Sequence, residues 1–223
     1  MSSSQIPLSL PHETSFARVD FMTAPCNEAA VRQMDLWPGW PHAVMALVGP
    51  EGSGKSHLAS DWAARAGARR FTPQMPADSL AGGDPAPVLI EDADRGAYAE
   101  DTVLHVYNWV RETGQTLLLT ARTAPTRWPV RLPDLRSRLS TVPVMEIGPP
   151  DDTLLALLLA KLFADRQLAV APDVVTYLLP RMERRFDFAH RLVALMDSRA
   201  LSSKRALTIP LARDCLESLA SGL

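Results

Sequence analysis

The stretch Gly49-Pro50-Glu51-Gly52-Ser53-Gly54-Lys55-Ser56 decides the fold of this chain. It satisfies the P-loop pattern, in which a glycine and four variable residues precede glycine, lysine and serine or threonine. The apolar run 43–48 before it suits a buried strand, and residues 55–66 after it suit a helix. The sequence therefore predicts a phosphate-binding turn between a strand and the first turn of a helix.

The residues of this turn have defined chemical roles at a nucleotide. Glycines let backbone N–H groups converge on phosphate oxygens, Lys55 can reach the β and γ phosphates, and the Ser56 hydroxyl can ligate Mg²⁺. An ordinary glycine-rich turn is the alternative, and the flanking strand and helix argue against it. We expect ADP or ATP, with Mg²⁺, to bind at Gly49, Pro50, Glu51, Gly52, Ser53, Gly54, Lys55, Ser56 and His57.

A second apolar strand, residues 88–92, ends in the acids Glu91 and Asp92. In P-loop enzymes such a strand delivers carboxylates to the metal ion and to the attacking water. In most of these enzymes the first of the two acids is an aspartate that holds the metal, whereas here it is Glu91. The glutamate side chain is one methylene longer than aspartate, so Glu91 binds Mg²⁺ either directly or through water. We predict that Glu91 and Ser56 hold the metal and that Asp92 is the catalytic carboxylate. The alternative is a solvated pair of acids at a strand end.

Strand and helix patterns alternate over the first two thirds of the chain. Further strands are expected near 70–72, 115–120 and 142–147, and the alternation predicts an α/β fold with a parallel five-stranded sheet between helices. After Gly148 the apolar residues keep to helical spacing. We therefore expect a mobile N-terminal arm (1–15), a nucleotide-binding α/β domain (16–148) and a small all-helical lid domain (149–223).

Charge and hydropathy exclude several classes of protein. The 223 residues carry a formal net charge of −2 with a pI of about 6.2, which disfavours direct, non-specific binding to nucleic acid. The longest aliphatic run, residues 154–160, is far shorter than the roughly 20 residues of a membrane span. The start does not resemble a signal peptide. We expect a cytoplasmic protein without membrane contact.

Blocks along the chain resemble, in order and spacing, the Hda family of short DnaA relatives within the AAA+ ATPases. The most specific blocks are Leu132-Pro133-Asp134-Leu135-Arg136-Ser137-Arg138-Leu139 and Gln5-Ile6-Pro7-Leu8-Ser9-Leu10; the others are 49–58, the acidic strand end, 117–120 and 207–210. The resemblance implies a regulator that docks on the DNA-loaded β sliding clamp of DNA polymerase III and promotes hydrolysis of ATP held by DnaA. DnaA and the clamp are then the partners, DNA is reached only through the clamp, and self-association is left open.

Two of these blocks carry family roles with a physical basis. In the N-terminal block, Pro7 favours an extended Ile6, and in an extended chain Leu8 and Leu10 share one face. With Gln5, these residues resemble the clamp-binding motif. Arg138 matches the arginine finger that acts in trans on a neighbour's γ-phosphate, and the nearby Arg136 is the alternative.

The chain also departs from its relatives at the nucleotide. Arg122 follows the sensor-strand residue Thr120 where relatives carry a polar or acidic residue, and Asp187 stands where the lid usually supplies a nucleotide-contacting arginine. Arg184 or Arg185 is a candidate substitute. An acid beside a triphosphate is repulsive, so the protein's own ATP hydrolysis is expected to be weak, and whether the chain is itself an enzyme is left open.

Two other functions fit a P-loop fold. A small-molecule kinase would need a substrate pocket with its own base, and the five histidines are scattered along the chain. A helicase-loader or DNA-remodelling AAA+ ATPase would need a basic stripe or a DNA-binding domain. The sequence favours the clamp-dependent regulator, with the helicase-loader or DNA-remodelling ATPase as the main alternative.

Overall fold

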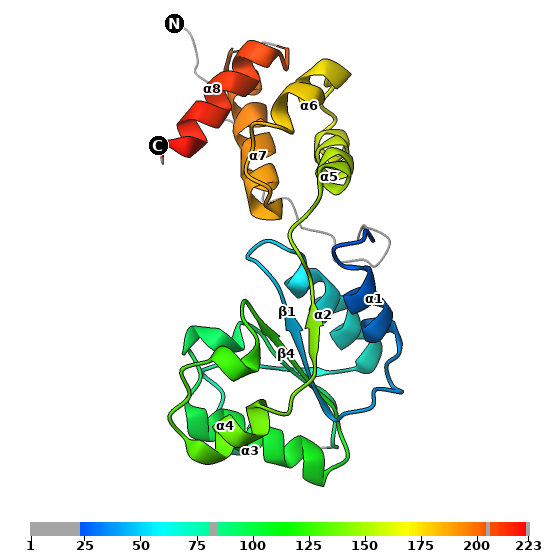
Figure 1. Ribbon diagram of the computed structural model, residues 1–223, viewed down its shortest axis with the longest axis vertical. Coiled ribbons are helices and arrows are strands. Elements are labelled where there is room, and N and C mark those ends of the chain that lie inside the picture. Colours follow the sequence, from blue (N-terminus) through cyan, green and yellow to red (C-terminus); the bar gives the residue numbers. More distant parts are fainter. Residues whose placement is uncertain (1–22, 81–83, 204–205, 222–223) are drawn as a thin grey trace, which may run out of the picture.

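The computed structural model describes residues 23–80, 84–203 and 206–221 of the chain. The predicted arm, 1–15, and its clamp-binding motif lie outside these ranges. An α/β domain is followed along the chain by a group of helices that lies beyond one end of the sheet (Figure 1).

Five parallel strands form one sheet in the order β2-β3-β4-β1-β5. The central strands β1 and β4 are buried along their whole length, because their Val, Leu, Met and Ala side chains meet helices on both faces. The strands are β1 (Val44–Val48), β2 (Arg69–Phe71), β3 (Val88–Ile90), β4 (Leu117–Ala121) and β5 (Val144–Glu146). The predicted α/β fold with a parallel five-stranded sheet is confirmed. Its order brings the carboxyl ends of β1, β4 and β3 side by side.

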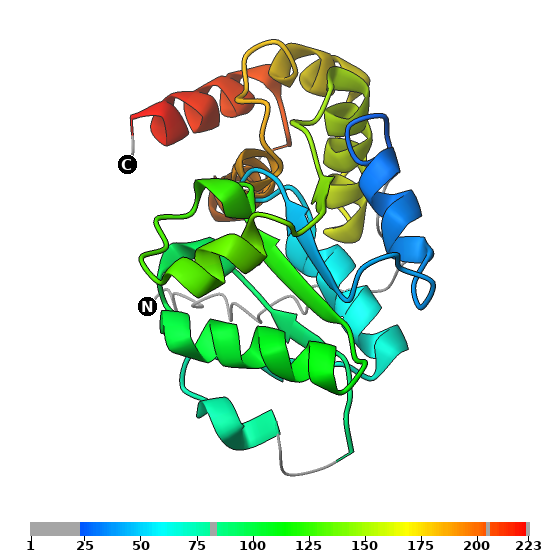
Figure 2. The same cartoon turned by 60° about the horizontal axis from the view of Figure 1, so that its bottom comes forward.

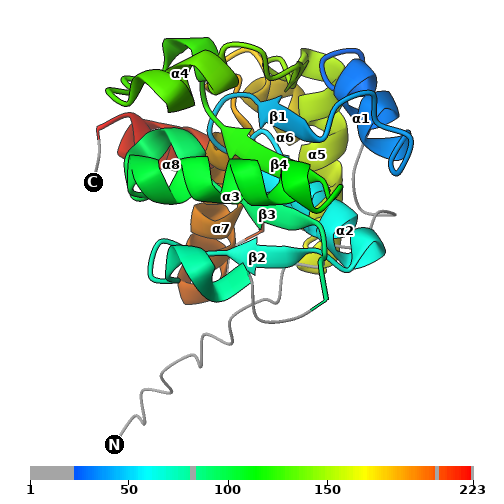
Figure 3. The same ribbon diagram turned by 90° about the horizontal axis from the view of Figure 1, so that it is seen from below.

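Helices cover both faces of this sheet (Figures 2 and 3). On one face α1 (Glu28–Asp35) and α2 (Lys55–Ala66) enclose a core around the fully buried Trp62, on which Trp40 stacks. On the other face α3 (Glu100–Glu112) and α4 (Pro133–Leu139) contribute Tyr107 and Leu135 to a second core. The strands therefore lie in the middle of three layers.

The remaining helices bury a core of their own. These are α5 (Asp152–Asp165), α6 (Pro172–Leu178), α7 (Phe186–Ser203) and α8 (Ile209–Ala220), and their core includes Phe163, Leu192 and Met196. Asp151 caps α5 by accepting a hydrogen bond from the Leu154 N–H at 2.7 Å. Among the described helices, none is long and apolar enough to cross a membrane.

The segment that leads into α4 is tied to the start of α3 by the carboxylate of Glu100. Its oxygens accept hydrogen bonds from the Arg131 N–H at 3.0 and 3.1 Å and from the Leu132 N–H at 2.7 Å. These bonds hold the pKa of Glu100 below its ordinary value. A lowered carboxyl pKa stabilises the fold at neutral pH, and that stabilisation is lost as the pH falls through the lowered pKa.

Glu100→Gln is therefore expected to lower the urea midpoint at pH 7 and to approach the parent protein in acid, where Glu100 is protonated. Urea unfolding over a pH series measures this. Glu112→Gln, at the other end of α3, is the matched control. A difference between Glu100→Gln and the parent that does not depend on pH would contradict the role given to the carboxylate.

Candidate functional site

The P-loop forms a narrow turn between β1 and α2. Gly52 and Gly54 adopt φ values of +71° and +89°, which favour glycine. A Cβ at Gly49 would lie 2.7 Å from the carbonyl oxygen of Ile147, beside β5. The predicted turn thus lies at the carboxyl end of β1, directly before the first turn of α2.

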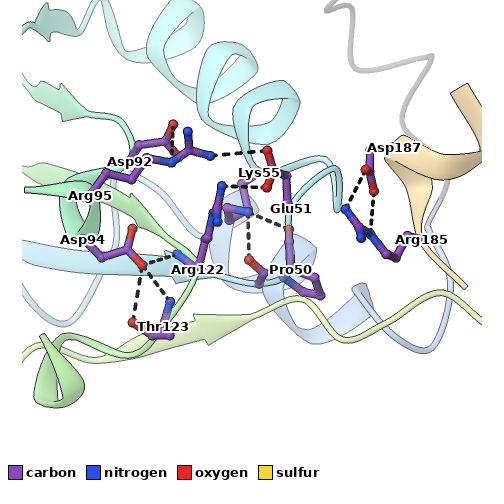
Figure 4. A network of polar contacts seen from close by, with 11 residues as sticks. Pro50, Glu51, Lys55, Asp92, Asp94, Arg95, Arg122, Thr123, Arg185 and Asp187 are labelled. Atoms are coloured by element: carbon purple, nitrogen blue, oxygen red, sulfur yellow. Dashed lines mark hydrogen bonds and ion pairs between the residues drawn. The ribbon is translucent and has the colours of Figure 1, made fainter. Parts of the chain in front are cut away.

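Lys55 is 7% exposed and folds back into this turn (Figure 4). Its ammonium group donates hydrogen bonds to the carbonyl oxygens of Gly49 and Pro50 at 2.8 and 2.7 Å. Burial lowers the pKa of Lys55, and the nearby Arg122 adds to this, while Asp92, Asp94 and Glu51 act in the opposite direction. The lysine therefore lies among charges that come from the P-loop and from the ends of β3 and β4.

The residues of the turn fit a phosphate group. The Ser53 hydroxyl is buried without a hydrogen-bond partner in the described part of the chain. The first N–H groups of α2 have no partner within the helix, and such a helix start attracts anions. The Lys55 ammonium group hydrogen-bonds the carbonyls of the loop itself. Nucleotide binding at Gly49–Ser56 and His57 stays a prediction that these features support.

The two predicted acids face different surroundings. The strand ends at Ile90, two residues earlier than expected, because Asp92 has a left-handed backbone with φ of +51°. Glu91 accepts a hydrogen bond from Arg70 on β2 at 2.7 Å. The Asp92 N–H instead donates to the Thr120 hydroxyl at 3.0 Å. Asp92 thereby joins the ends of β3 and β4, whereas Glu91 is bound to β2.

No group of three or more His, Cys, Asp or Glu residues within the described ranges could hold a metal ion. Mg²⁺ at a phosphate site takes one or two carboxylates together with phosphate oxygens and water, so such a group is not required. Ser56 is exposed at the start of α2. Metal binding by Ser56 and Glu91 stays a prediction, and it requires Mg²⁺ to compete with Arg70 for Glu91.

An ion cluster that the sequence analysis did not anticipate lies over the P-loop. Glu51 meets Arg122 Nη2 with its Oε2 at 2.6 Å and Arg95 Nη2 with its Oε1 at 3.5 Å. Arg95 also lies 3.4 Å from Asp92. The cluster depends on which strands are neighbours in the sheet, and this order is not visible in the sequence. The high density of charged residues in 91–95 was the local feature that pointed to it.

The start of α7 touches the P-loop from the lid side. A Cβ on Gly52 would lie 2.5 Å from the backbone nitrogen of Asp187. Arg185 binds the Asp187 carboxylate at two points, 2.7 and 3.0 Å, and lies 3.3 Å from Glu183. Arg184 is 3.1 Å from Asp152. Both candidate substitutes for the lid arginine are thus engaged by acids of the lid.

Arg138 lies away from its own P-loop. Its guanidinium group stacks over the Tyr107 ring of α3, 5.5 Å from the ring centre. It shares a shallow hollow with Asn108, Arg111 and Glu112 at the carboxyl end of α3. The chain runs from the carboxyl end of α3 to the start of β4. This hollow therefore lies at the amino-terminal ends of the strands, whereas the P-loop lies at their carboxyl-terminal ends. Arg136, the alternative, is exposed on the same short helix.

Gly52→Ala is expected to destabilise the protein by about 1–3 kcal/mol more than Gly67→Ala. Both glycines have positive φ, but only at Gly52 would the new Cβ meet backbone atoms, whereas nothing lies within 4 Å at Gly67. Chemical unfolding of the two variants measures the difference. Equal losses would show that the lid does not press on the P-loop.

Comparisons with known proteins cover the lid helices by sequence and most of the chain by structure. Residues 151–216 match the family model described as Hda, lid domain. Domain III of the replication initiation protein DnaA from Thermotoga maritima is similar over 91% of this chain and 96% of that domain, with a TM-score of 0.75 and 15% identity.

Two further structures share the fold. DnaA bound to AMPPCP and single-stranded DNA is similar with a TM-score of 0.62 and 16% identity, over 84% of this chain and 67% of that chain. The Thermotoga maritima RuvB Holliday junction branch migration motor is similar with a TM-score of 0.63 and 16% identity, over 87% of this chain and 66% of that one. Residues 151–216 therefore match the lid domain of the Hda family, and the chain shares the fold of DnaA domain III and of RuvB.

Proposed function

We propose that the protein regulates replication initiation: it binds the DNA-loaded β sliding clamp and stimulates hydrolysis of ATP bound to DnaA, which leaves inactive DnaA-ADP. The observation that carries this proposal is the place of Arg138. Its guanidinium group lies at the amino-terminal ends of the strands, whereas the P-loop of the same chain lies at their carboxyl-terminal ends. This position supports a role for Arg138 at a nucleotide held by another molecule, and the match to the Hda lid supports DnaA as that molecule.

Arginine suits this task for physical reasons. Its guanidinium group stays charged and can donate two parallel hydrogen bonds to phosphate oxygens as charge develops in the transition state. An arginine supplied in trans accelerates nucleotide hydrolysis by about 10³- to 10⁵-fold. Tyr107 is 6% exposed and holds the guanidinium group by a cation–π contact, which limits the rotamers that Arg138 must give up when it binds.

The protein's own P-loop is proposed to bind ADP or ATP with Mg²⁺. Gly49–Ser56 and His57 would hold the phosphates, and Ser56 with Glu91 would hold the metal. The nucleotide supplies negative charge at the point where the lid meets the P-loop. Asp187 beside Gly52 holds Arg185 in a two-point pair, so this arginine is engaged away from the phosphates, which supports weak hydrolysis by this chain and a mainly structural nucleotide. Asp92 is proposed as the catalytic carboxylate, and its backbone hydrogen bond to Thr120 at the end of β4 supports this role.

Arg138→Ala is expected to retain folding, nucleotide binding and clamp binding but to lose stimulation of DnaA, because the finger makes its contact outside its own molecule. Arg138→Lys should rescue little, since an ammonium group lacks the planar two-point geometry. Arg136→Ala is the matched control on the same helix. Single-turnover phosphate release from DnaA loaded with ATP, with clamp on DNA, measures the effect. Full stimulation by Arg138→Ala would refute the finger.

Clamp binding is proposed for Gln5, Ile6, Pro7, Leu8 and Leu10. Replacing Gln5, Leu8 and Leu10 together by alanine should abolish binding to purified clamp and leave nucleotide binding intact, because the P-loop lies in a separate part of the chain. Surface plasmon resonance on immobilised clamp measures this, with Ser2, Ser3 and Ser4 replaced together by alanine as the control. Undiminished binding by the first variant would place the clamp contact elsewhere.

A further inference from the structure

We propose that Arg122 and Arg95 bind the terminal phosphate of this chain's own nucleotide in place of a lid arginine, and that Glu51 holds their guanidinium groups until the phosphate arrives. The inference rests on the proposed nucleotide binding and is independent of the action on DnaA.

The two arginines come from neighbouring strand ends. Arg122 directly follows β4, and Arg95 ends the short helix η3 (Ala93–Arg95) that follows β3. Their guanidinium groups meet the Glu51 carboxylate from the side of the sheet (Figure 4). In P-loop enzymes the terminal phosphate and the attacking water lie at these strand ends, beside the P-loop lysine. Both arginines are therefore placed for a triphosphate rather than for a base or sugar.

Glu51 resembles a phosphate in the way it is bound. Each of its two oxygens faces one guanidinium group, as two oxygens of a phosphate would. The side chains of Glu51, Arg95 and Arg122 are 50%, 44% and 43% exposed, so an incoming anion can reach them. Because Glu51 belongs to the P-loop itself, a bound phosphate competes with its carboxylate for the same cations.

Asp94 positions Arg122 for this contact. Its Oδ2 accepts hydrogen bonds from the N–H groups of Arg122 at 2.8 Å and Thr123 at 3.1 Å, and from the Thr123 hydroxyl at 3.3 Å. These bonds fix the segment after β4 to η3. The base of the Arg122 side chain is thereby held in place while its guanidinium group remains exchangeable.

The lid arginines are less available. Arg185 spends both its Nε and its Nη2 on Asp187, and Arg184 contacts Asp152. The Arg185–Asp187 pair lies on the other side of the P-loop from Arg122 and Arg95 (Figure 4). Arg185 also interacts electrostatically with Glu51. A phosphate could bind Arg185 only after the two-point pair between Arg185 and Asp187 had been broken. Within the described residues, the guanidinium group of Arg122 forms an ion pair with one oxygen of Glu51, which a phosphate has to displace.

Calorimetric titration of the full, nucleotide-free protein with ADP and with a non-hydrolysable ATP analogue, both with Mg²⁺, tests the proposal. Arg122→Ala should weaken binding of the analogue by about tenfold or more, the usual worth of a hydrogen bond to a charged group, and should change ADP binding much less. Arg95→Ala should act in the same direction. Glu51→Gln should tighten binding of the analogue, because it removes a competitor and a negative charge.

Two further variants are the positive and negative controls of this titration. Lys55→Ala should lose both nucleotides, and Arg65→Ala should lose neither, because Arg65 pairs with Asp61 and Asp35 away from the P-loop. Arg122→Lys, together with melting curves, separates a lost contact from a lost fold.

Unchanged binding of the analogue by Arg122→Ala, an equal loss of ADP binding, or a loss seen in Arg184→Ala or Arg185→Ala instead would overturn the proposal. Absence of nucleotide binding by the parent protein would do the same. If the expected pattern holds but the parent does not stimulate DnaA, the proposed function fails and this inference stands.

Discussion

The close approach of Gly52 to the first turn of α7 is the contact on which the arrangement of this molecule depends. A side chain at Gly52 would overlap the backbone of Asp187, so the P-loop and the lid can meet only because this residue is glycine. The contact sets where α7 begins relative to the phosphate site. It also brings Asp187 to the position where the sequence analysis expected a nucleotide-contacting arginine. Arg185 pairs with the carboxylate of Asp187 and neutralises its charge. In the proposed nucleotide complex, the other cations around the phosphates therefore come from the segments that follow the strands of the sheet.

The sheet provides them because of its strand order. With β4 between β3 and β1, the segments after β3 and β4 both border the P-loop, and Arg95 and Arg122 converge on Glu51. The opposite edge of the same sheet carries Arg138 over Tyr107. One molecule thus has its P-loop at one end of the strands and Arg138, stacked on Tyr107, at the other. This polarity suits a protein that acts on a nucleotide held by a partner.

Much of the fold could be predicted because its signals are local. The apolar strand, glycine turn and helix around Lys55 follow one another along the chain, and the alternation of patterns predicted the parallel sheet. The ion cluster over the P-loop could not be predicted, since Glu51, Arg95 and Arg122 are brought together only by the strand order. The end of β3 was misplaced because the left-handed backbone of Asp92 has no signal in an apolar pattern followed by acids. The pairing of Arg185 with Asp187 depends on rotamers and was equally inaccessible.

The central claim is that Arg138 acts on a phosphate held by DnaA. The most direct measurement is a cryo-electron microscopy structure of the protein with clamp on DNA and DnaA bound to a non-hydrolysable ATP analogue. The account predicts that Arg138 extends from the face of Tyr107, with its guanidinium nitrogens about 2.7–2.9 Å from γ-phosphate oxygens on DnaA. An Arg138 that faces solvent in that complex, or a different residue at that phosphate, would contradict the account.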